Sequence, residues 1–244
     1  MNSYLGQIPL FQCVPTTERE DLGVLCELRR FRRADVIFEE GHPAESVWIV
    51  IRGWVYLVKR TPQGSPVTIF TVTPEEAICG LSAFEHGRYS AGAIAATDTR
   101  LLRIPAGKFS ELLERNSTFA KQVLLTCCVR IRHMAESLSL AQAPVEQRLA
   151  YALLRLQATF GRTIPVTHQE LARMAGTRWE TSIRTLGSMK RRGWVASARG
   201  QVTILAPEQL RATLQGPKGR GRFSFPYGTS LFSPSLLAER NERK

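Results

Sequence analysis

A short segment in the last third of the chain has polar and charged residues at a spacing that suits recognition of a nucleic acid. Two Thr-x-x-Glu patterns occur there, formed by Thr167 with Glu170 and by Thr177 with Glu180. Each pattern predicts a capping box, in which a hydroxyl and a carboxylate bind free backbone N–H groups at the start of a helix. Gly176 lies between the patterns, where a sharp turn with positive φ is expected. Two short helices joined by such a turn form a helix-turn-helix.

The second predicted helix, residues 178–192, has two different faces when its residues are placed about 100° apart. One face should pack on the first helix (168–175), through Leu171 and Met174. This packing face is formed by Ser182, Thr185, Leu186 and Met189. The opposite face should point outward, and it is formed by Glu180, Ile183, Arg184, Gly187 and Arg191.

Several side chains near the outward face are candidates for contacts with DNA. Arg184 can donate two hydrogen bonds to guanine, Glu180 can accept one from cytosine, and Ile183 can contact a thymine methyl. Simpler roles without DNA contact stay open for two of these residues. Glu180 could only cap the helix, and Arg184 could be an ordinary solvated charge. Trp179, at the helix start, is either a packing anchor or a further base contact. Phosphate contacts, which position a protein without reading sequence, are expected from Thr177, Arg178, Lys190, Arg191, Arg192 and Arg199.

The distribution of charge supports a polyanionic partner. The chain has 244 residues and a formal net charge of +12. Residues 1–143 contain 16 Lys and Arg against 15 Asp and Glu, whereas residues 144–244 contain 17 against 6. A basic domain beside a nearly neutral one is typical of a nucleic-acid-binding domain joined to a domain of another kind. The alternative, a basic surface that serves solubility alone, leaves this segregation unexplained.

The N-terminal part has the pattern of a β-rich domain. Residues 18–30 predict a short amphipathic helix. Runs rich in β-branched and aromatic residues then recur between Gly/Pro turns, at 36–38, 47–51, 55–58, 67–72 and 101–104. Strands at this spacing predict an antiparallel sandwich or a barrel-like roll.

Helical periodicity returns after Ala106, and a long helix should run from the interruption at Asn116-Ser117 to about Gln142. Apolar residues recur along it at steps of three and four, at Leu124, Cys127, Ile131, Met134, Leu138 and Ala141. This narrow stripe favours a seam with the same helix of a second copy, and packing on its own domain is the alternative. A further helix is predicted over Val145–Gln157, and a small hairpin between Val195 and Leu205.

Other function classes find no support in the sequence. The cysteines, at 13, 26, 79, 127 and 128, form no CxxC pattern, so neither a disulfide framework nor a metal site is predicted. No apolar run approaches the roughly 20 residues of a membrane span. Residues 1–10 do not resemble a secretory signal, so a cytoplasmic protein is expected. Gly-rich phosphate loops and the HExxH and GxSxG motifs are absent, and we do not expect an enzyme.

Three stretches, in order along the chain, resemble the CRP/FNR superfamily over about residues 8–211. Residues 37–53 (IFEEGHPAESVWIVIRG) resemble the opening strands of its cyclic-nucleotide-binding β-roll. The long helix resembles its dimerisation helix, and residues 167–186 resemble its winged helix-turn-helix. The resemblance implies a bacterial transcription regulator that binds a palindromic DNA site as a homodimer, with Glu180 and Arg184 reading bases. An arginine that the cyclic-AMP branch often uses for this purpose falls where Trp179 stands.

The resemblance also implies the organisation of the chain. We expect an α+β fold with a β-roll sensor over 1–108, a dimerisation helix over 109–143, a winged helix-turn-helix over 144–212 and a basic flexible tail over 213–244. RNA polymerase is an expected partner, and a signal at the β-roll should set the affinity for DNA.

The sensor segment departs from the cyclic-AMP branch of the family. Residues 80–82 (Gly-Leu-Ser) lack the carboxylate that would bind the ribose, and residues 89–91 (Tyr-Ser-Ala) lack the aligned arginine for the phosphate. Arg88 lies one residue earlier. A buried phosphate without an arginine is unfavourable, so cyclic AMP is not the expected effector. The candidates for an effector pocket are Gly80, Leu81, Ser82, Arg88, Tyr89 and Ser90.

The effector therefore stays open. Residues 79–84 look closer to the FNR-type branch, but the N-terminal cysteine cluster that holds its iron–sulfur centre is missing. Haem at His42 or His86, thiol oxidation at Cys79 or at Cys127 and Cys128, and activity without a ligand are the alternatives. The rival to the whole interpretation is a ligand-binding or redox signalling module that does not read DNA.

Overall fold

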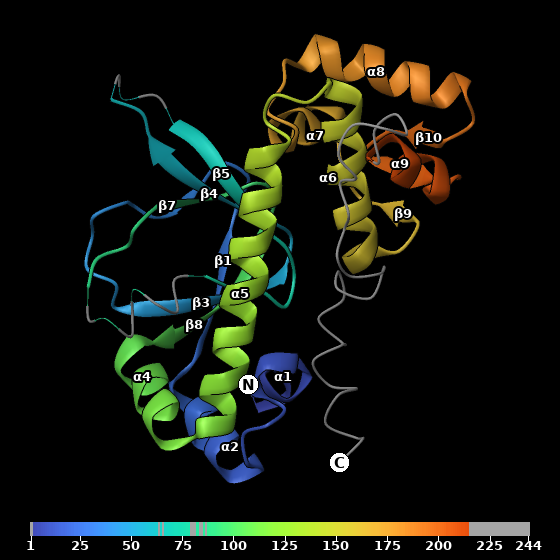
Figure 1. The fold of residues 1–244 in the computed structure, drawn as a ribbon. Coiled ribbons are helices and arrows are strands. Elements are labelled where there is room, and N and C mark those ends of the chain that lie inside the picture. Colours follow the sequence, from blue (N-terminus) through green and yellow to red (C-terminus); the bar gives the residue numbers. More distant parts are fainter. Residues whose placement is uncertain are drawn as a thin grey trace. The chain divides into compact units, whose positions relative to one another are not determined.

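Two antiparallel four-stranded sheets form the β-rich part of the chain (Figure 1). The first has the order β1-β8-β3-β6, from β1 (Glu27–Phe31), β8 (Thr99–Pro105), β3 (Ser46–Arg52) and β6 (Ala77–Ile78). The second has the order β2-β7-β4-β5, from β2 (Val36–Phe38), β7 (Gly92–Ala95), β4 (Val55–Arg60) and β5 (Pro66–Val72). The predicted sandwich or roll is confirmed.

The computed structural model describes residues 2–62, 64, 66–78, 82, 85 and 87–214. They fall into two compact units, and the border lies between Arg132 and His133, inside the long helix α5 (Ser117–Ser139). The first unit holds both sheets and the N-terminal helices, and the second holds the C-terminal helices and a small sheet. Most of the predicted tail, from residue 215 onward, lies outside the described residues.

Strand β3 is buried on both faces from Ser46 to Val50, which explains its nearly continuous apolar sequence. Ile49 pairs with Leu102, and both side chains belong to a cluster formed with the helices. Val50 pairs with Leu101, and these belong to a second cluster that also contains residues of the other sheet. Alternate residues of one strand therefore serve two cores.

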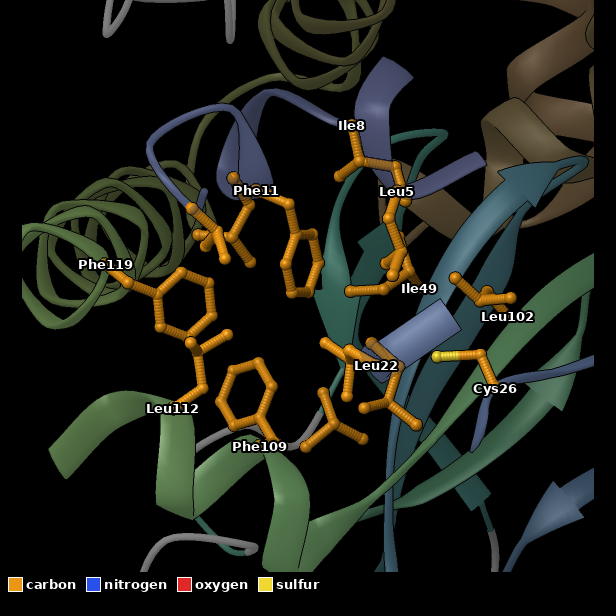
Figure 2. Packing of buried hydrophobic residues seen from close by; sticks show 14 of the residues in the cluster. Leu5, Ile8, Phe11, Leu22, Cys26, Ile49, Leu102, Phe109, Leu112 and Phe119 are labelled. Atoms are coloured by element: carbon orange, nitrogen blue, oxygen red, sulfur yellow. The ribbon is translucent and has the colours of Figure 1, made fainter. Parts of the chain in front are cut away.

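The helical core is aromatic at its centre. Figure 2 shows Phe11, Phe109 and Phe119 converging near Ile49 and Leu102. The ring centroids of Phe11 and Phe119 lie 5.2 Å apart, and those of Phe109 and Phe119 lie 5.4 Å apart. Both distances are typical of stabilising aromatic pairs. Because Phe119 begins the long helix α5, this packing fixes that helix to the first unit.

The N-terminal helices are α1 (Asn2–Gln7), the 3-10 helix η1 (Pro9–Phe11) and α2 (Thr16–Leu25), and α4 (Ala106–Arg115) follows the sheets. The helix predicted over residues 18–30 is wrong in its second half, where β1 pairs with β8 from Glu27 to Phe31. Pairing with a distant strand outweighs the local helical period there. The interruption predicted at Asn116 is confirmed, since it separates α4 from α5.

The second unit contains α6 (Val145–Phe160), α7 (His168–Met174), α8 (Trp179–Arg191) and α9 (Pro207–Leu214). Its sheet has the order β10-β11-β9, from β10 (Val195–Ala198), β11 (Gln201–Ile204) and β9 (Thr163–Ile164). Helix α9 runs past the domain end expected at residue 212, because Leu210 and Leu214 are buried. We therefore extend the proposed C-terminal domain to Leu214.

The end of α5 is fixed to α6 within the second unit. The Tyr151 hydroxyl donates a hydrogen bond to Oε2 of Glu136 at 2.9 Å. Burial, with Glu136 as the second cause, raises the pKa of Tyr151 above its usual value, so this hydroxyl stays protonated and able to donate. Helix α5 is thus held by the β-rich unit near its start and by α6 near its end.

Within the described residues, no helix combines the length and apolar character needed to cross a membrane. The same part of the chain contains no group of three or more His, Cys, Asp and Glu suited to holding a metal ion.

Candidate nucleic-acid interface

The first helix of the predicted pair begins with the expected capping box. The Glu170 amide donates to the Thr167 hydroxyl at 3.2 Å, and the Thr167 amide donates to the Glu170 carboxylate at 2.7 Å. The Thr167 hydroxyl also donates to this carboxylate at 2.8 Å, and Glu170 is only 3% exposed. A nearly buried carboxylate requires such partners, so the box stabilises the start of α7.

The capping box predicted for the second helix is wrong. Helix α8 begins at Trp179 with Arg178 as its N-cap residue, and no side chain caps it. Thr177 still belongs to the turn, since its amide donates to the carbonyl of Ala172 at 2.9 Å. The Glu180 carboxylate is therefore not used in a capping box, and it lies exposed on the surface of α8.

The two threonines give a matched stability test. We expect Thr167→Ala to lower the free energy of unfolding by about 1–2 kcal/mol, because it removes the hydroxyl that caps the Glu170 amide and that donates to the buried Glu170 carboxylate. Thr177→Ala should change it by less than about 0.5 kcal/mol, as is usual for surface positions. Urea unfolding of both variants followed by circular dichroism measures the difference. Equal losses would show that the box does not stabilise α7.

The turn between the two helices has the predicted glycine conformation. Gly176 has a φ of +55°, and its carbonyl accepts a hydrogen bond from Nη1 of Arg148 at 2.9 Å. Arg148 lies on α6, so that helix supports the turn from outside the pair. Sequence reasoning missed this role, because no local pattern connects residues so far apart in the chain.

The two faces of α8 lie as the helical wheel predicted. Ser182, Leu186 and Met189 are buried, and Leu171 of α7 is buried on the facing side. The opposite face exposes Glu180, Ile183, Arg184 and Arg191, whereas Gly187 is half-buried. Among the ion pairs of the described residues, none involves Glu180 or Arg184. Both are therefore available to an external partner.

Trp179 is not a packing anchor. Its side chain is 52% exposed at the first position of α8, and Ile183, one turn further on, is 37% exposed. Of the two readings that the sequence left open, burial of Trp179 within its own domain is therefore excluded.

Basic side chains surround this exposed face. Arg178, Lys190 and Arg191 are exposed on α8 or beside it, and Arg199 is exposed at the tip of the β10–β11 hairpin, where Ala198 pairs with Gln201. From residue 145 to 214 the chain has 11 Lys and Arg against 4 Asp and Glu. A nucleic-acid backbone would meet a positive surface here.

Arg192 has a different role from the predicted phosphate contact. Its guanidinium donates two hydrogen bonds to the Glu146 carboxylate, at 2.9 and 2.7 Å, and lies 3.7 Å from the centre of the Trp194 ring. A bidentate pair with a stacked ring holds the guanidinium in one orientation. Arg192 thus joins the end of α8 to the start of α6, and we assign it a structural role.

The predicted dimer stripe is exposed on α5, with two corrections. Helix α5 ends at Ser139, so Ala141 lies beyond the helix that was expected to reach Gln142. Leu124 is 61%, Ile131 65% and Leu138 76% exposed, and Met134 is 38% exposed. Cys127 is instead half-buried against the helical core of its own domain. Of the two adjacent cysteines, Cys128 is the exposed one. Its steps of four and three also fit the heptad, and this is the signal that could have identified it.

The predicted effector-pocket residues do not share one environment. Tyr89 is buried in the core between the sheets, where its ring stacks on Phe38 at 3.8 Å between centroids. Its hydroxyl accepts a hydrogen bond from Nε1 of Trp48 at 3.3 Å and donates to the Ser46 carbonyl at 3.0 Å. Tyr89 therefore fills the core, and its hydroxyl is already engaged within the domain.

The other candidates for the effector pocket include both buried and exposed residues. Ser82 is buried and Ser90 is exposed. Arg88 is exposed, and its Nη1 donates to the Gly41 carbonyl at 2.7 Å. Gly80 and Leu81 lie outside the described residues. The six positions thus remain candidates, and the described ones differ in exposure.

The candidates for haem or thiol chemistry are also dispersed. Burial raises the pKa of Cys26 to about 11 and also raises the pKa of Cys13 and Cys127. Because the thiolate is the reactive form, these thiols are poorly reactive near neutral pH. His42 is exposed, with Nε2 3.6 Å from the Glu39 carboxylate. Cys79 and His86 lie outside the described residues.

Comparison with known proteins identifies both parts of the chain. The model of the cyclic nucleotide-binding domain matches residues 28–116, and that of the Crp-like helix-turn-helix domain matches residues 147–213. The cyclic AMP receptor protein of Thermus thermophilus is 30% identical over 199 residues, covering 80% of this chain and 92% of that protein. The CRP-like cAMP-activated global transcriptional regulator of Mycobacterium tuberculosis is 26% identical over 219 residues, covering 86% and 98%.

The fold has a solved counterpart. The structure of FixK2 from Bradyrhizobium japonicum aligns with a TM-score of 0.69 and 18% sequence identity, over 77% of this chain and 96% of that one. At this identity the likeness concerns the fold.

Proposed function

The chain belongs to the CRP/FNR family of transcription regulators, which bind DNA through the helix-turn-helix, and from this premise we propose how it reads its target. Two copies bind a palindromic site, and each places α8 in the major groove of one half-site, about 34 Å from the other. The observation that carries this proposal is the exposed face of α8, where Glu180 and Arg184 have no ion-pair partner within the described residues.

The proposed contacts follow from chemistry and exposure. Arg184 donates to guanine, Glu180 accepts from cytosine, and Ile183 and Trp179 make further base contacts. Thr177 lies in the turn before α8, and its hydroxyl is suited to a phosphate. The cations proposed to bind phosphates are Arg178, Lys190, Arg191 and Arg199, all exposed. Arg192 is left out because Glu146 already binds its guanidinium.

Dimerisation is proposed along α5. The exposed stripe of Leu124, Ile131, Met134 and Leu138 has the spacing of a two-helix seam. Burial of three exposed leucine and isoleucine side chains per copy would be favourable, at about 25 cal/mol per Å² of apolar surface removed from water. The twofold axis of the dimer would then relate the two α8 helices to a twofold DNA site.

Control by a signal is proposed to act through α5, since the β-rich unit holds its start and α6 holds its end. A shift of α5 against its twin would change the spacing of the two α8 helices and hence the affinity for DNA. We place the sensor in residues 1–108 and the dimerisation helix in α5 (Ser117–Ser139), which is shorter than the expected 109–143 because residues 109–115 belong to α4. We also propose that the protein acts in the cytoplasm with RNA polymerase.

The signal is proposed to differ from cyclic AMP. The sequence lacks the carboxylate and the aligned arginine of the cyclic-AMP branch, and Arg88 is exposed and bonded to the Gly41 carbonyl. Tyr89 fills the core where a ligand-binding side chain was considered. Both observations support a sensor that recognises another effector, or none.

The salt dependence of binding tests the proposal. Four cations in each of two subunits would neutralise about eight phosphates, so a plot of log K against log salt concentration should have a slope of about −7. Fluorescence anisotropy with a selected duplex and the full-length chain measures it. A flat response, or the same affinity for selected and unrelated duplexes, would exclude specific DNA binding by this face.

A further inference from the structure

The outward face of α8 includes an apolar surface formed by Trp179 and Ile183. These residues are four positions apart, so their side chains are neighbours on one side of the helix. They are 52% and 37% exposed. The other tryptophans differ, since Trp48 and Trp54 are buried and Trp194 lies under the Arg192 guanidinium. Trp179 is thus a large aromatic group that its own domain leaves uncovered.

The surroundings of this surface indicate what covers it. Arg178, Glu180 and Arg184 flank it, and all three are exposed. Half-exposed aromatic side chains often act as anchors in interfaces. A partner for this face must therefore present hydrogen-bonding groups for the Glu180 carboxylate and the arginine guanidinium groups. It must also present apolar groups that reach Trp179 and Ile183. The major groove of DNA does so, because thymine presents a 5-methyl group beside the hydrogen-bonding edges of its neighbours.

We infer that Trp179 and Ile183 read the 5-methyl groups of thymine, so that each half-site has an A·T pair beside the G·C pair read by Glu180 and Arg184. This inference rests on the proposed reading of DNA by α8, and it adds which base the apolar side chains select. 5-Methylcytosine carries the same methyl group, so it should replace thymine at the contacted position better than cytosine does.

The test removes one methyl group at a time. The preferred site is first selected from randomised duplexes with the full-length chain, and each thymine is then replaced by deoxyuridine, which keeps the Watson–Crick edge and lacks the methyl. Loss of one buried methyl contact should weaken binding about fourfold, and replacement in both half-sites should weaken it about fifteenfold. The remaining positions should be insensitive to the replacement.

Variants assign the effect to the side chain. Trp179→Ala should lose most of the preference for thymine over deoxyuridine, because the larger of the two groups that contact the methyl is gone. Trp179→Arg should change the preference at that position from thymine to guanine, which arginine binds through O6 and N7. Leu205→Ala is the matched control, since Leu205 is 50% exposed in the same unit but lies after β11. The Leu205→Ala variant should show the same loss of affinity as the wild type when thymine is replaced by deoxyuridine.

The outcomes separate this inference from the proposed function. An enriched site to which wild-type protein binds equally with thymine or deoxyuridine at every position overturns methyl reading and leaves DNA reading intact. The inference also fails if Trp179→Ala retains the full wild-type preference for thymine over deoxyuridine, or if the variant binds all duplexes more weakly by the same factor, as loss of a backbone contact would cause. A selection that enriches no sequence overturns the proposed function itself.

Discussion

Replacement of Arg184 by alanine is expected to abolish most of the preference for the specific site while the protein remains folded. A bidentate arginine–guanine contact provides about 1–3 kcal/mol of discrimination. Two half-sites then give about 2–6 kcal/mol, a loss of at least about 30-fold in specific affinity. Stability should not change, because Arg184 is exposed and has no ion pair within the described residues. Anisotropy titrations with specific and unrelated duplexes measure both affinities.

Arg191→Ala is the control on the same helix. Arg191 is exposed near the C-terminal end of α8, where we propose a phosphate contact. Its loss should weaken specific and unrelated duplexes by the same factor and make the salt slope less steep by about one per subunit. Arg162→Ala, an exposed arginine between α6 and β9, should change neither quantity.

One result would favour the rival interpretation as a signalling module that does not read DNA. If Arg184→Ala, Arg191→Ala and the wild-type chain bind all duplexes alike, the exposed face of α8 has no part in DNA recognition. If Arg191→Ala alone lowers the affinity, the domain binds the DNA backbone and Arg184 does not contribute to sequence reading.

Patterns that depend on a few neighbouring residues were predictable from the sequence. The Thr167–Glu170 box, the positive φ of Gly176 and the two faces of α8 each follow from local chemistry, and all three are present. The Thr177–Glu180 pattern does not form a capping box, although it has the same Thr-x-x-Glu sequence. The Thr177 amide is used by the preceding turn, and the helix starts at Trp179, one residue later than predicted. A capping pattern thus predicts a helix start only where the turn leaves its amide free.

Contacts between distant residues were not predictable from a single sequence. Arg192 looked like one more cation in a basic run, and only the fold brings Glu146 and Trp194 beside it. The same holds for Cys127 and Cys128, since both fit an apolar step of three or four. Packing of Cys127 against the helical core decides which of them faces outward. The burial of each side chain, rather than the periodicity of the sequence, therefore decides which residues belong to the exposed stripe.

Replacement of Leu138 by aspartate is expected to convert the dimer into a monomer and to lower the affinity for the palindromic site by about 10²–10⁴-fold, as the second half-site no longer binds as part of the same molecule. In a symmetric two-helix seam each copy contributes the same position, so two carboxylates would meet at the axis in an apolar setting. Leu138 is 76% exposed in the single chain, so the monomer itself should fold normally. Sedimentation velocity and anisotropy measure the two effects.

Val24→Asp is the matched control, because Val24 is 78% exposed and belongs to α2 rather than to the α5 stripe. It should remain a dimer and bind the palindrome normally. Ile131→Asp, one heptad before Leu138, should repeat the Leu138→Asp result, since both residues belong to the same seam. If both α5 variants stay dimeric, the copies associate through another surface. If they become monomers that bind the palindrome at full affinity, one subunit is sufficient and the two half-sites are not read together.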